Sequence, residues 1–371
     1  MKIYINKYFE DNRLEKFLDQ KFEVYSRSGL NETEKRLINK LETLIEPQRI
    51  LILENRTGVI AMIAKSLFPQ AEISIMNIDK YYCDKIEHNL KHNDFSKLDV
   101  KCEADITGEY DVILYQQTEA NLVKELVLDL VQQSHKCLKK GGKLFLAMEK
   151  KEKIITERMQ ELFGGATLDG LNDKGLILIG KKKNNLVEYI EYSADFIFTD
   201  ALGQELTFRS LPGVFAHHRV DEGAKALQDV VEIEDGNTLL DMGCGIGSIG
   251  ITLAKKKNLN MVYFVDSNCR AIRVTEYNCE KNGIKNYLAE LTATGYPAPA
   301  KCHVFTGNPP YFSDFRIAGI FVETARDNLL KGGKAWFVTR NPWKLAEIIK
   351  KHFNNCREIR HHGYSILVSE R

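Results

Sequence analysis

The 371-residue sequence lacks several features that mark special classes of protein. No apolar run approaches the roughly 20 residues that cross a bilayer, and residues 1–10 carry charges where a signal peptide would be apolar. The eight cysteines form no Cys-x-x-Cys pair, which argues against a zinc site and against a disulfide framework. The nine histidines give no defensible set of metal ligands. We therefore expect a cytoplasmic protein with reduced thiols, no membrane contact and no metal.

An excess of one charge is also absent, because 52 basic residues face 51 acidic ones. A nucleic-acid substrate would have to be held by local patches or by its shape, since the chain has no general positive field. Prolines are few, at 8, and 44% of the residues are hydrophobic, which is typical of ordinary globular domains. The length favours two such domains.

The two halves of the chain repeat one order of apolar runs and turns. The expected strands are 49–53, 72–79, 111–115 and 144–148 in the first half and 237–241, 260–266, 303–306 and 335–339 in the second. The second strand of each half ends in an acid, Asp79 or Asp266. Strands that alternate with helices predict parallel sheets covered on both faces. We expect two tandem Rossmann-like α/β domains, residues 1–185 and 186–371.

The halves differ where chemistry is expected. The first strand-to-helix turn reads DMGCGIGSIG in the second half (241–250) and LENRTGVIAM in the first (53–62), with one glycine. Glycines let a ligand approach the backbone and the amides of a helix N-terminus. At the end of the third expected strand, the second half has GNPP (307–310) where the first has YQQT (115–118). We infer that the first domain is a degenerate copy, kept for substrate binding or stability.

The glycine turn by itself is compatible with two cofactors. Residues 245–250 fit the dinucleotide pattern G-x-G-x-x-G, and Asp266 follows about 20 residues later, where a ribose-binding acid belongs. Asp241 favours S-adenosylmethionine instead, because a carboxylate can accept from that donor's ammonium group but repels a pyrophosphate. Asp266 would then accept from the ribose hydroxyls of the methyl donor. A nicotinamide cofactor, or a turn that serves packing alone, stays open at this point.

Asn308, Pro309, Pro310 and Tyr311 follow a predicted strand, at the carboxyl edge of the sheet where ligands bind in open α/β folds. An exocyclic amine is a poor nucleophile because its lone pair is delocalised into the base. The Asn308 side-chain oxygen and the Pro309 carbonyl can each accept one of its N–H bonds, which directs the lone pair at a methyl sulfonium. Proline has a fixed φ and no N–H, so it holds that carbonyl rigidly. Tyr311 offers a ring on which a flipped base can stack.

With these motifs the sequence resembles class I methyltransferases that act on exocyclic amines, above all the bacterial small-subunit ribosomal RNA (guanine-N2)-methyltransferase C family. The resemblance is carried by the duplication with a degenerate first copy, by the Asn-Pro-Pro-aromatic motif, and by LTFRSLPGVF (206–215) followed by Asp-Glu-Gly (221–223). It implies S-adenosylmethionine as cofactor and a guanine N2 of ribosomal RNA, free or in the ribosomal subunit, as acceptor. It also implies that Phe215 and Asp221 lie near the ligands.

The predicted catalytic residues are Asn308, Pro309, Pro310 and Tyr311. The predicted cofactor-binding residues are Asp241, Gly243, Cys244, Gly245, Gly247, Asp266, Ser267, Thr292, Phe215 and Asp221. Tyrosine at position 311 is also common among adenine-N6 and glutamine-N5 methyltransferases, so methylation of adenine in RNA or DNA, or of a protein glutamine, is the alternative function. A catalytically silent scaffold is a third hypothesis.

Overall fold

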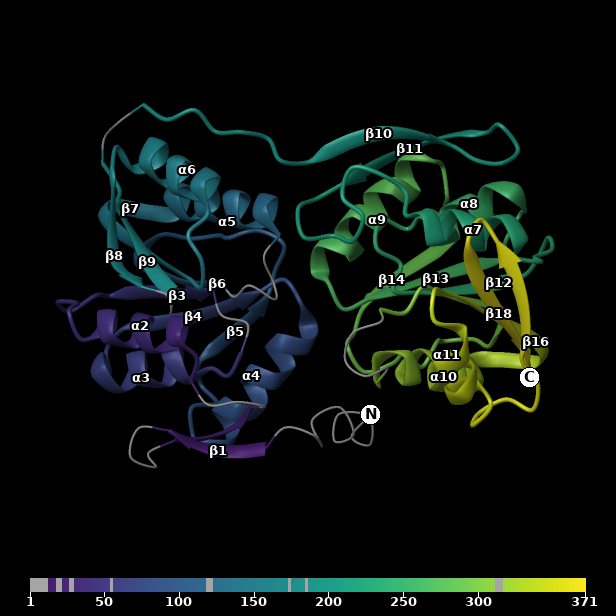
Figure 1. Ribbon diagram of the computed structural model, residues 1–371, viewed down its shortest axis with the longest axis horizontal. Helices are drawn as coiled ribbons and strands as arrows, with labels where there is room; N and C mark the ends of the chain where they lie inside the picture. The colour runs from purple at the N-terminus through teal and green to yellow at the C-terminus, as the bar shows by residue number, and fades with distance from the viewer. Residues whose placement is uncertain are drawn as a thin grey trace. The chain divides into compact units, whose positions relative to one another are not determined.

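The computed structural model describes residues 13–17, 22–26, 30–53, 56–117, 123–172, 175–183, 186–310 and 316–371. The chain divides into two compact units, Met1–Tyr192 and Ser193–Arg371, which Figure 1 draws in purple to teal and in teal to yellow. The predicted boundary, between residues 185 and 186, precedes this division by a short stretch of chain. Within the described part, no helix is long and apolar enough to span a bilayer.

The first unit is built on a seven-stranded sheet with the order β5-β4-β3-β6-β7-β9-β8. Strand β9 runs antiparallel to both of its neighbours, β7 and β8, and the other neighbouring pairs are parallel. The strands are β3 (Arg49–Leu53), β4 (Glu72–Asn77), β5 (Asp99–Cys102), β6 (Tyr110–Gln117), β7 (Leu138–Met148), β8 (Ala166–Asn172) and β9 (Gly175–Lys181), after a hairpin of β1 (Arg13–Phe17) and β2 (Phe22–Ser26). The helices are α2 (Glu32–Leu41), α3 (Val59–Leu67), α4 (Lys80–His92), α5 (Lys124–Cys137) and α6 (Lys153–Phe163).

The second unit repeats this topology, with the order β14-β13-β12-β15-β16-β18-β17 and β18 antiparallel to its neighbours. The strands are β12 (Thr238–Met242), β13 (Met261–Asp266), β14 (Tyr287–Leu291), β15 (Cys302–Gly307), β16 (Leu329–Thr339), β17 (Arg357–His361) and β18 (Tyr364–Glu370), after a hairpin of β10 (Ala194–Thr199) and β11 (Glu205–Ser210). The helices are α7 (Glu222–Val230), α8 (Ser248–Lys256), α9 (Cys269–Lys281), α10 (Arg316–Asn328) and α11 (Pro342–Ile349). The predicted fold class, two tandem Rossmann-like α/β domains, is confirmed.

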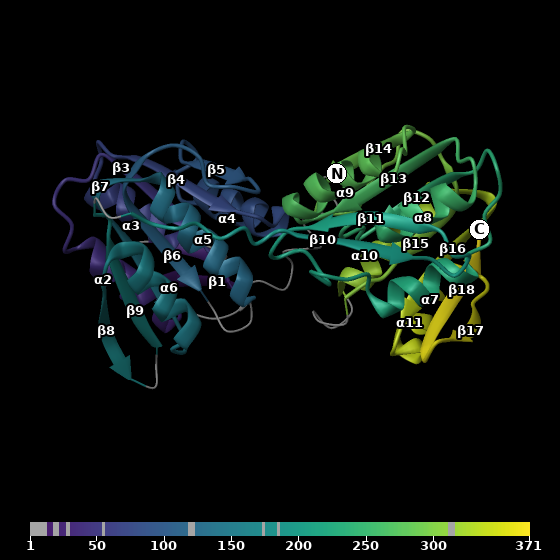
Figure 2. The same cartoon turned by 90° about the horizontal axis from the view of Figure 1, so that it is seen from above.

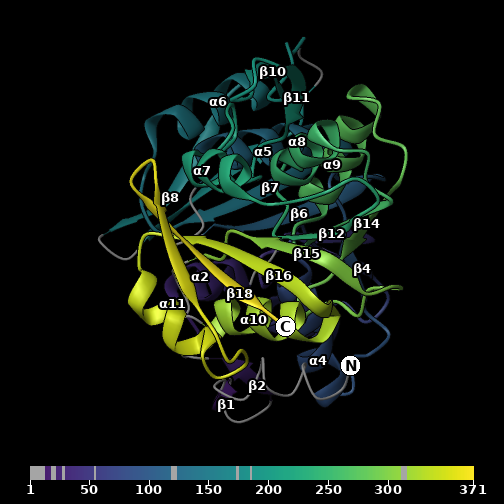
Figure 3. The same cartoon turned by 90° about the vertical axis from the view of Figure 1, so that its right-hand side faces the viewer.

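Helices cover both faces of the second sheet. Every residue of β12 is buried, as expected for a central strand with a helical layer on each side. One core packs α7, α8 and α9 against the sheet, and the other packs α10 and α11 against the opposite face. Figures 1 and 3 show these two layers. The hairpin of β10 and β11 lies over α9 (Figure 2), where Asn278 of the helix binds the backbone of Arg209 through both its oxygen and its nitrogen.

The strand registers align the two units residue by residue. Val304 pairs with Leu239 in the second sheet as Val112 pairs with Ile50 in the first. Counting along the strands from these pairs makes Gln116 the counterpart of Asn308, as the sequence comparison of GNPP with YQQT predicts.

One expected strand end in the first unit is wrong. Strand β4 ends at Asn77, and Asn77, not Asp79, is the counterpart of Asp266. Asp79 instead caps helix α4, where its side chain accepts a hydrogen bond from the Tyr81 backbone N–H at 2.9 Å. Aspartate competes well for an N-cap, so an acid shortly after an apolar run need not mark the strand end.

Candidate functional site

The glycine turn of the second unit joins β12 to α8 through three residues with positive φ, Gly243 (+70°), Gly245 (+58°) and Gly247 (+78°). A Cβ on Gly243 would lie 2.9 Å from the Phe321 ring, and one on Gly247 would lie 2.9 Å from Thr275. A Cβ on Gly245 would meet no atom within 4 Å. The outer glycines therefore serve close packing, while the middle one borders open space that a ligand can fill.

Asp266 connects this turn to the end of β13. Its carboxylate accepts from the Gly245 N–H and from the Asn268 N–H, each at 2.9 Å. Its backbone carbonyl accepts from the Thr292 N–H at 3.0 Å. Burial raises the pKa of Asp266, and the hydrogen bonds from the backbone of Asn268, Gly245 and Ser267 act against that rise. The structure thus brings three other predicted cofactor-binding residues to Asp266: Gly245 and Ser267 at its carboxylate, and Thr292 at its backbone carbonyl.

Asp241 and Cys244 lie beneath the turn. Asp241 is completely buried, and its two oxygens accept from the Thr306 hydroxyl at 2.9 Å and from the Gly250 N–H at 3.0 Å. Burial raises the pKa of this carboxyl to about 7. The Cys244 thiol packs into the core, 3.6 Å from the Thr275 hydroxyl. These buried side chains hold the glycine turn against the core. The predicted contact of Asp241 with the donor's ammonium group stays a prediction.

Asn308 follows β15 directly, and its amide nitrogen donates to Asp221 at 3.0 Å. The same Asp221 oxygen caps helix α7, accepting from the N–H groups of Gly223 at 2.9 Å and Ala224 at 3.1 Å. An ionised carboxylate can only accept, so the contact determines which way the Asn308 amide faces. The nitrogen points to Asp221, and the side-chain oxygen remains to accept from another group.

The remaining members of the predicted catalytic motif are partly described. Pro309 is buried and Pro310 is half-buried, whereas Tyr311 lies outside the described residues. Asp221, predicted among the cofactor-binding residues, contacts Asn308 of the predicted catalytic motif, and its contact with the donor stays a prediction. Its signal in the sequence is the N-cap pattern, an aspartate ahead of a short helix.

Tyr364, which was not predicted as a site residue, and Gly223, which was named only within the Asp-Glu-Gly motif, lie beside Asp221 and Asn308. A Cβ on Gly223 would be 3.2 Å from the Tyr364 ring and 3.5 Å from the Asn308 nitrogen, so the glycine allows both side chains to approach. The Tyr364 hydroxyl accepts from the Arg340 guanidinium at 2.7 Å. Because these residues come from separate elements, no local spacing in the sequence indicates their proximity.

The segment 211–215, predicted to lie over the ligands, is tied to the start of α9. Asn268 donates to the Gly213 carbonyl at 2.8 Å, and the Arg270 guanidinium donates to the Pro212 carbonyl at 2.9 Å. Asn268 also binds Asp266, so the segment and the acid share one anchor. Phe215 is 69% exposed at the end of this segment.

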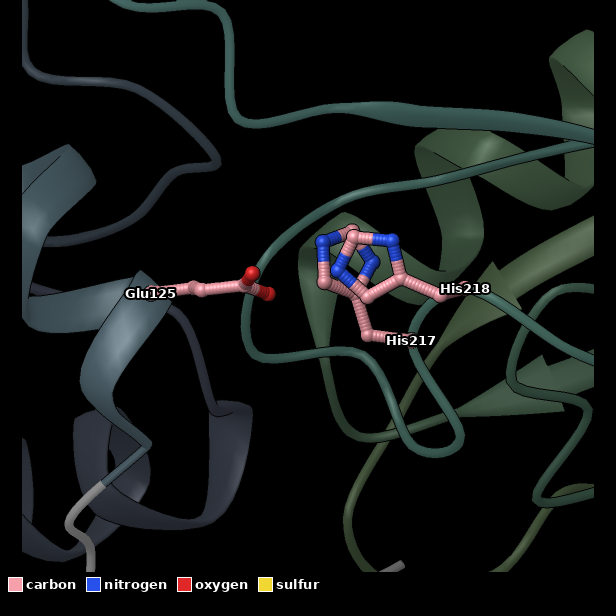
Figure 4. Close-up of side chains that lie close together, drawn as sticks. All are labelled: Glu125, His217 and His218. Atoms are coloured by element: carbon pink, nitrogen blue, oxygen red, sulfur yellow. The ribbon is translucent and has the colours of Figure 1, made fainter.

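Histidine pairs occur at two places in the second unit. The ring centroids of His217 and His218 lie 4.0 Å apart, and His217 contacts the Ser210 hydroxyl at 2.9 Å. Figure 4 shows the two neighbouring rings. The Nε2 atoms of His361 and His362 lie 3.3 Å and 3.7 Å from the Asp229 carboxylate. These are the distances of ordinary hydrogen bonds and ion pairs, and the expectation that the chain binds no metal stays a prediction.

In the first unit, larger side chains stand at the positions that correspond to the glycine turn and to Asn308. By the strand registers, Arg56 is the counterpart of Gly245, and it forms an ion pair at 3.0 Å with the completely buried Glu34. Gln116, the counterpart of Asn308, donates to the Asn31 side chain at 3.3 Å and to the Thr33 hydroxyl at 3.1 Å. Burial raises the pKa of Glu34, and Arg56 opposes that rise. A glycine that borders open space is thus replaced by a long charged side chain.

Comparisons with known proteins cover both units. The ribosomal RNA small subunit methyltransferase C of Acinetobacter baumannii (strain AYE) is 27% identical over 256 residues, which are 67% of this chain and 75% of that protein. The protein of that name from Pseudomonas syringae is 32% identical over 164 residues, 43% of this chain and 48% of its own. The solved 16S rRNA N2 methyltransferase of T. thermophilus, in complex with AdoMet and guanosine, shares the fold over 99% of both chains, with 20% identity and a TM-score of 0.77.

The predicted resemblance to the small-subunit ribosomal RNA methyltransferase C family is confirmed by these matches. The model of the methyltransferase small domain family matches twice, at residues 16–176 and 205–368. The two matched ranges correspond to the two sheets, so both units are recognisable as copies of the same domain, and the degeneracy of the first copy stays a prediction. The chain belongs to the methyltransferase small domain family.

Proposed function

We propose that the chain is an S-adenosylmethionine-dependent methyltransferase that methylates the exocyclic N2 amine of a guanine in small-subunit ribosomal RNA. The observation that carries this proposal is the orientation of the Asn308 amide by Asp221 at 3.0 Å. The names of the matched relatives, and the AdoMet and guanosine in the T. thermophilus structure, support the donor and the acceptor.

The residues of the glycine turn fit the methyl donor. The open space at Gly245 suits a ligand that approaches the backbone, and the N-terminus of α8 lies directly beyond it. One carboxylate oxygen of Asp266 accepts from Gly245 of the turn and the other from Asn268 at the start of α9, and each can accept a further hydrogen bond from a ribose hydroxyl. Thr292 and Phe215 would border the donor's adenine. When bound, S-adenosylmethionine supplies an electrophilic methyl group on a sulfonium.

Asn308 and Pro309 would then hold the acceptor amine. The Asn308 oxygen accepts one amine N–H, and the Pro309 carbonyl accepts the other, which withdraws the lone pair from the base and turns it toward the methyl group. A nitrogen–carbon bond forms as the carbon–sulfur bond breaks, and the methylated amine releases one proton to water. No side chain with an unusual pKa is required, because positioning supplies the rate enhancement.

The first unit, by this proposal, binds no donor and helps to hold the substrate or stabilise the chain. The enzyme works in the cytoplasm on ribosomal RNA or on the ribosomal subunit. The balance of 52 basic against 51 acidic residues implies that a folded RNA or an assembled particle is recognised by shape and local contacts.

The test incubates the full-length protein with labelled S-adenosylmethionine and, separately, ribosomal subunits, naked ribosomal RNA, tRNA and total protein from unmodified cells. The products are digested and identified by mass spectrometry. Label in N2-methylguanine from the small subunit or its RNA is the expected result. Label in N6-methyladenine or N5-methylglutamine would show that the acceptor is adenine or a protein glutamine instead of guanine. Failure to bind the donor would indicate a catalytically silent scaffold.

A further inference from the structure

A short segment after β16 combines an exposed arginine, an exposed tryptophan and a half-buried lysine. It comprises Arg340, Asn341, Pro342, Trp343 and Lys344. Trp343 is 63% exposed, whereas the other tryptophan of the chain, Trp336, is completely buried. The Lys344 ammonium lies 6.0 Å from the Trp343 ring centroid, and Arg340 is exposed. A large aromatic ring exposed to solvent, with a cation beside it and a second cation three residues away in the sequence, is unusual for a surface without a ligand.

This segment lies at the same sheet edge as Asn308. Strands β15 and β16 are parallel neighbours, with Gly307 paired to Phe337, so the residues that follow them leave the sheet side by side. Asn308 follows the first of these strands directly, and Arg340 follows the second.

Tyr364 connects the segment to the amine-binding residues. Its hydroxyl accepts from Arg340 at 2.7 Å, and the guanidinium carbon lies 4.7 Å from the centroid of its ring. The other edge of that ring approaches Gly223, which adjoins both Asp221 and the Asn308 nitrogen. The contacts therefore run without a break from Asn308 to Arg340.

We propose that Arg340, Trp343 and Lys344 form a platform that binds the RNA strand adjoining the target nucleotide. Arg340 binds a backbone phosphate, and Trp343 stacks on an unpaired base with Lys344 at its rim. The inference rests on the proposed function, since it takes RNA as the substrate. A protein substrate is less favoured because both charged residues of the segment, Arg340 and Lys344, are positive, which complements phosphate.

The platform also explains how a chain with almost no net charge can bind RNA. A protein with no net positive field gains little nonspecific affinity for RNA, so its affinity must come from a few local contacts. An aromatic ring contributes stacking that is insensitive to salt, and an arginine contributes a phosphate contact that weakens as salt increases. The two contributions can therefore be measured separately.

The test compares Trp343→Ala, Arg340→Gln and Arg340→Lys with two control variants of exposed residues outside the platform. Leu202→Ala, in the turn of the β10–β11 hairpin, removes another exposed apolar side chain, and Arg360→Gln, on β17, removes another exposed arginine. Binding of naked small-subunit ribosomal RNA is measured over a range of salt concentrations, with KM, kcat and donor affinity measured alongside. The buried Trp336 reports by fluorescence that Trp343→Ala is folded.

Trp343→Ala is expected to weaken RNA binding and to raise KM by about tenfold or more, with unchanged salt dependence, kcat and donor affinity. Arg340→Gln is expected to weaken binding and to lower the slope of log affinity against log salt by about 1, whereas Arg340→Lys retains most of that slope. RNA affinity in Trp343→Ala and Arg340→Gln equal to that of the controls would overturn the platform. A wild-type protein that binds RNA through these residues but methylates none of it would overturn the proposed function and leave the platform standing.

Discussion

Asn308 owes its direction to a single acidic neighbour. Asp221 accepts from the Asn308 nitrogen and from two backbone N–H groups of α7 with one oxygen, so the amide and the helix start are fixed together. The acid thereby acts as a positioning residue for the amide that would bind the substrate amine. At the residue scale, the geometry of the proposed reaction depends on this contact.

Replacing Asp221 by asparagine tests the contact with little risk to the helix, because asparagine is an equally good N-cap. An amide partner can donate as well as accept, so Asn308 would no longer be confined to one orientation. We expect kcat to fall by about tenfold, with donor affinity unchanged, since the loss amounts to about 1.4 kcal/mol of orientation. Steady-state kinetics with saturating donor measure it, and an unchanged kcat would show that Asp221 serves only as the cap.

The buried carboxyl of Asp241 should make the second unit pH-sensitive. Burial raises its pKa from the ordinary 3.8 to about 7, so the folded state binds a proton that the unfolded state releases between these values. Its contribution to stability is present at low pH and is lost as pH rises from about 4 to about 7. We expect the stability of the wild type relative to Asp241→Asn to be greater at pH 5 than at pH 8.

Tryptophan fluorescence during urea unfolding measures this difference for the second unit alone, because both tryptophans of the chain, Trp336 and Trp343, belong to it. A difference between wild type and variant that stays constant from pH 5 to pH 8 would contradict the account of Asp241.

At the scale of elements, the three glycines of the turn between β12 and α8 have two different roles, close packing and the opening of space for a ligand. Gly243 and Gly247 are required because a Cβ would collide with Phe321 or Thr275, while Gly245 borders open space. A methyl group on Gly245 therefore tests the space itself rather than the packing of the turn.

Gly245→Ala is expected to lower donor affinity by tenfold or more while the unit stays folded. Alanine at its φ of +58° costs roughly 1–2 kcal/mol of backbone strain, but no atom lies within 4 Å of the added Cβ. Gly203→Ala is the matched control, since Gly203 has a φ of +80° in the β10–β11 turn and equally open surroundings. Calorimetric titration with S-adenosylmethionine measures the affinity. Equal affinities for both variants would show that the donor does not bind at this turn.

Much of the fold could be predicted because it depends on local patterns. The apolar runs of the two halves repeat in the same order along the chain, and the two seven-stranded sheets have the same strand order. The site was less accessible from sequence, because its contacts join distant segments. Asp221 and Asn308 are 87 residues apart, and nothing local connects Tyr364 with Gly223. The error at Asp79 arose because an acid may end a strand or cap a helix, and only packing decides.

At the scale of the whole molecule, the two copies of the domain differ at the turn after their first sheet strand. The turn borders open space in the second unit and is occupied by an arginine side chain in the first. Arg56 and Glu34 form an ion pair in the first unit where Gly245 borders open space in the second. A buried carboxylate with a charged partner is costly to rearrange for a ligand, so the first unit should not bind the donor.

We accordingly expect one molecule of S-adenosylmethionine per chain. Calorimetric titration of the full-length protein gives the stoichiometry directly, and Arg56→Ala, which shortens the side chain in the first unit, should leave both the number of sites and the affinity unchanged. Two sites per chain would mean that the first copy is not degenerate.

The most direct test of the account is the rate of methyl transfer by Asn308→Ala, measured with labelled S-adenosylmethionine and small-subunit ribosomal RNA beside the donor affinity of the same variant. Loss of one preorganised hydrogen-bonding group is expected to lower kcat by a factor on the order of 100 or more, while the affinity for the donor stays that of the wild type. Turnover close to the wild-type value would contradict the central claim that Asn308 holds the acceptor amine.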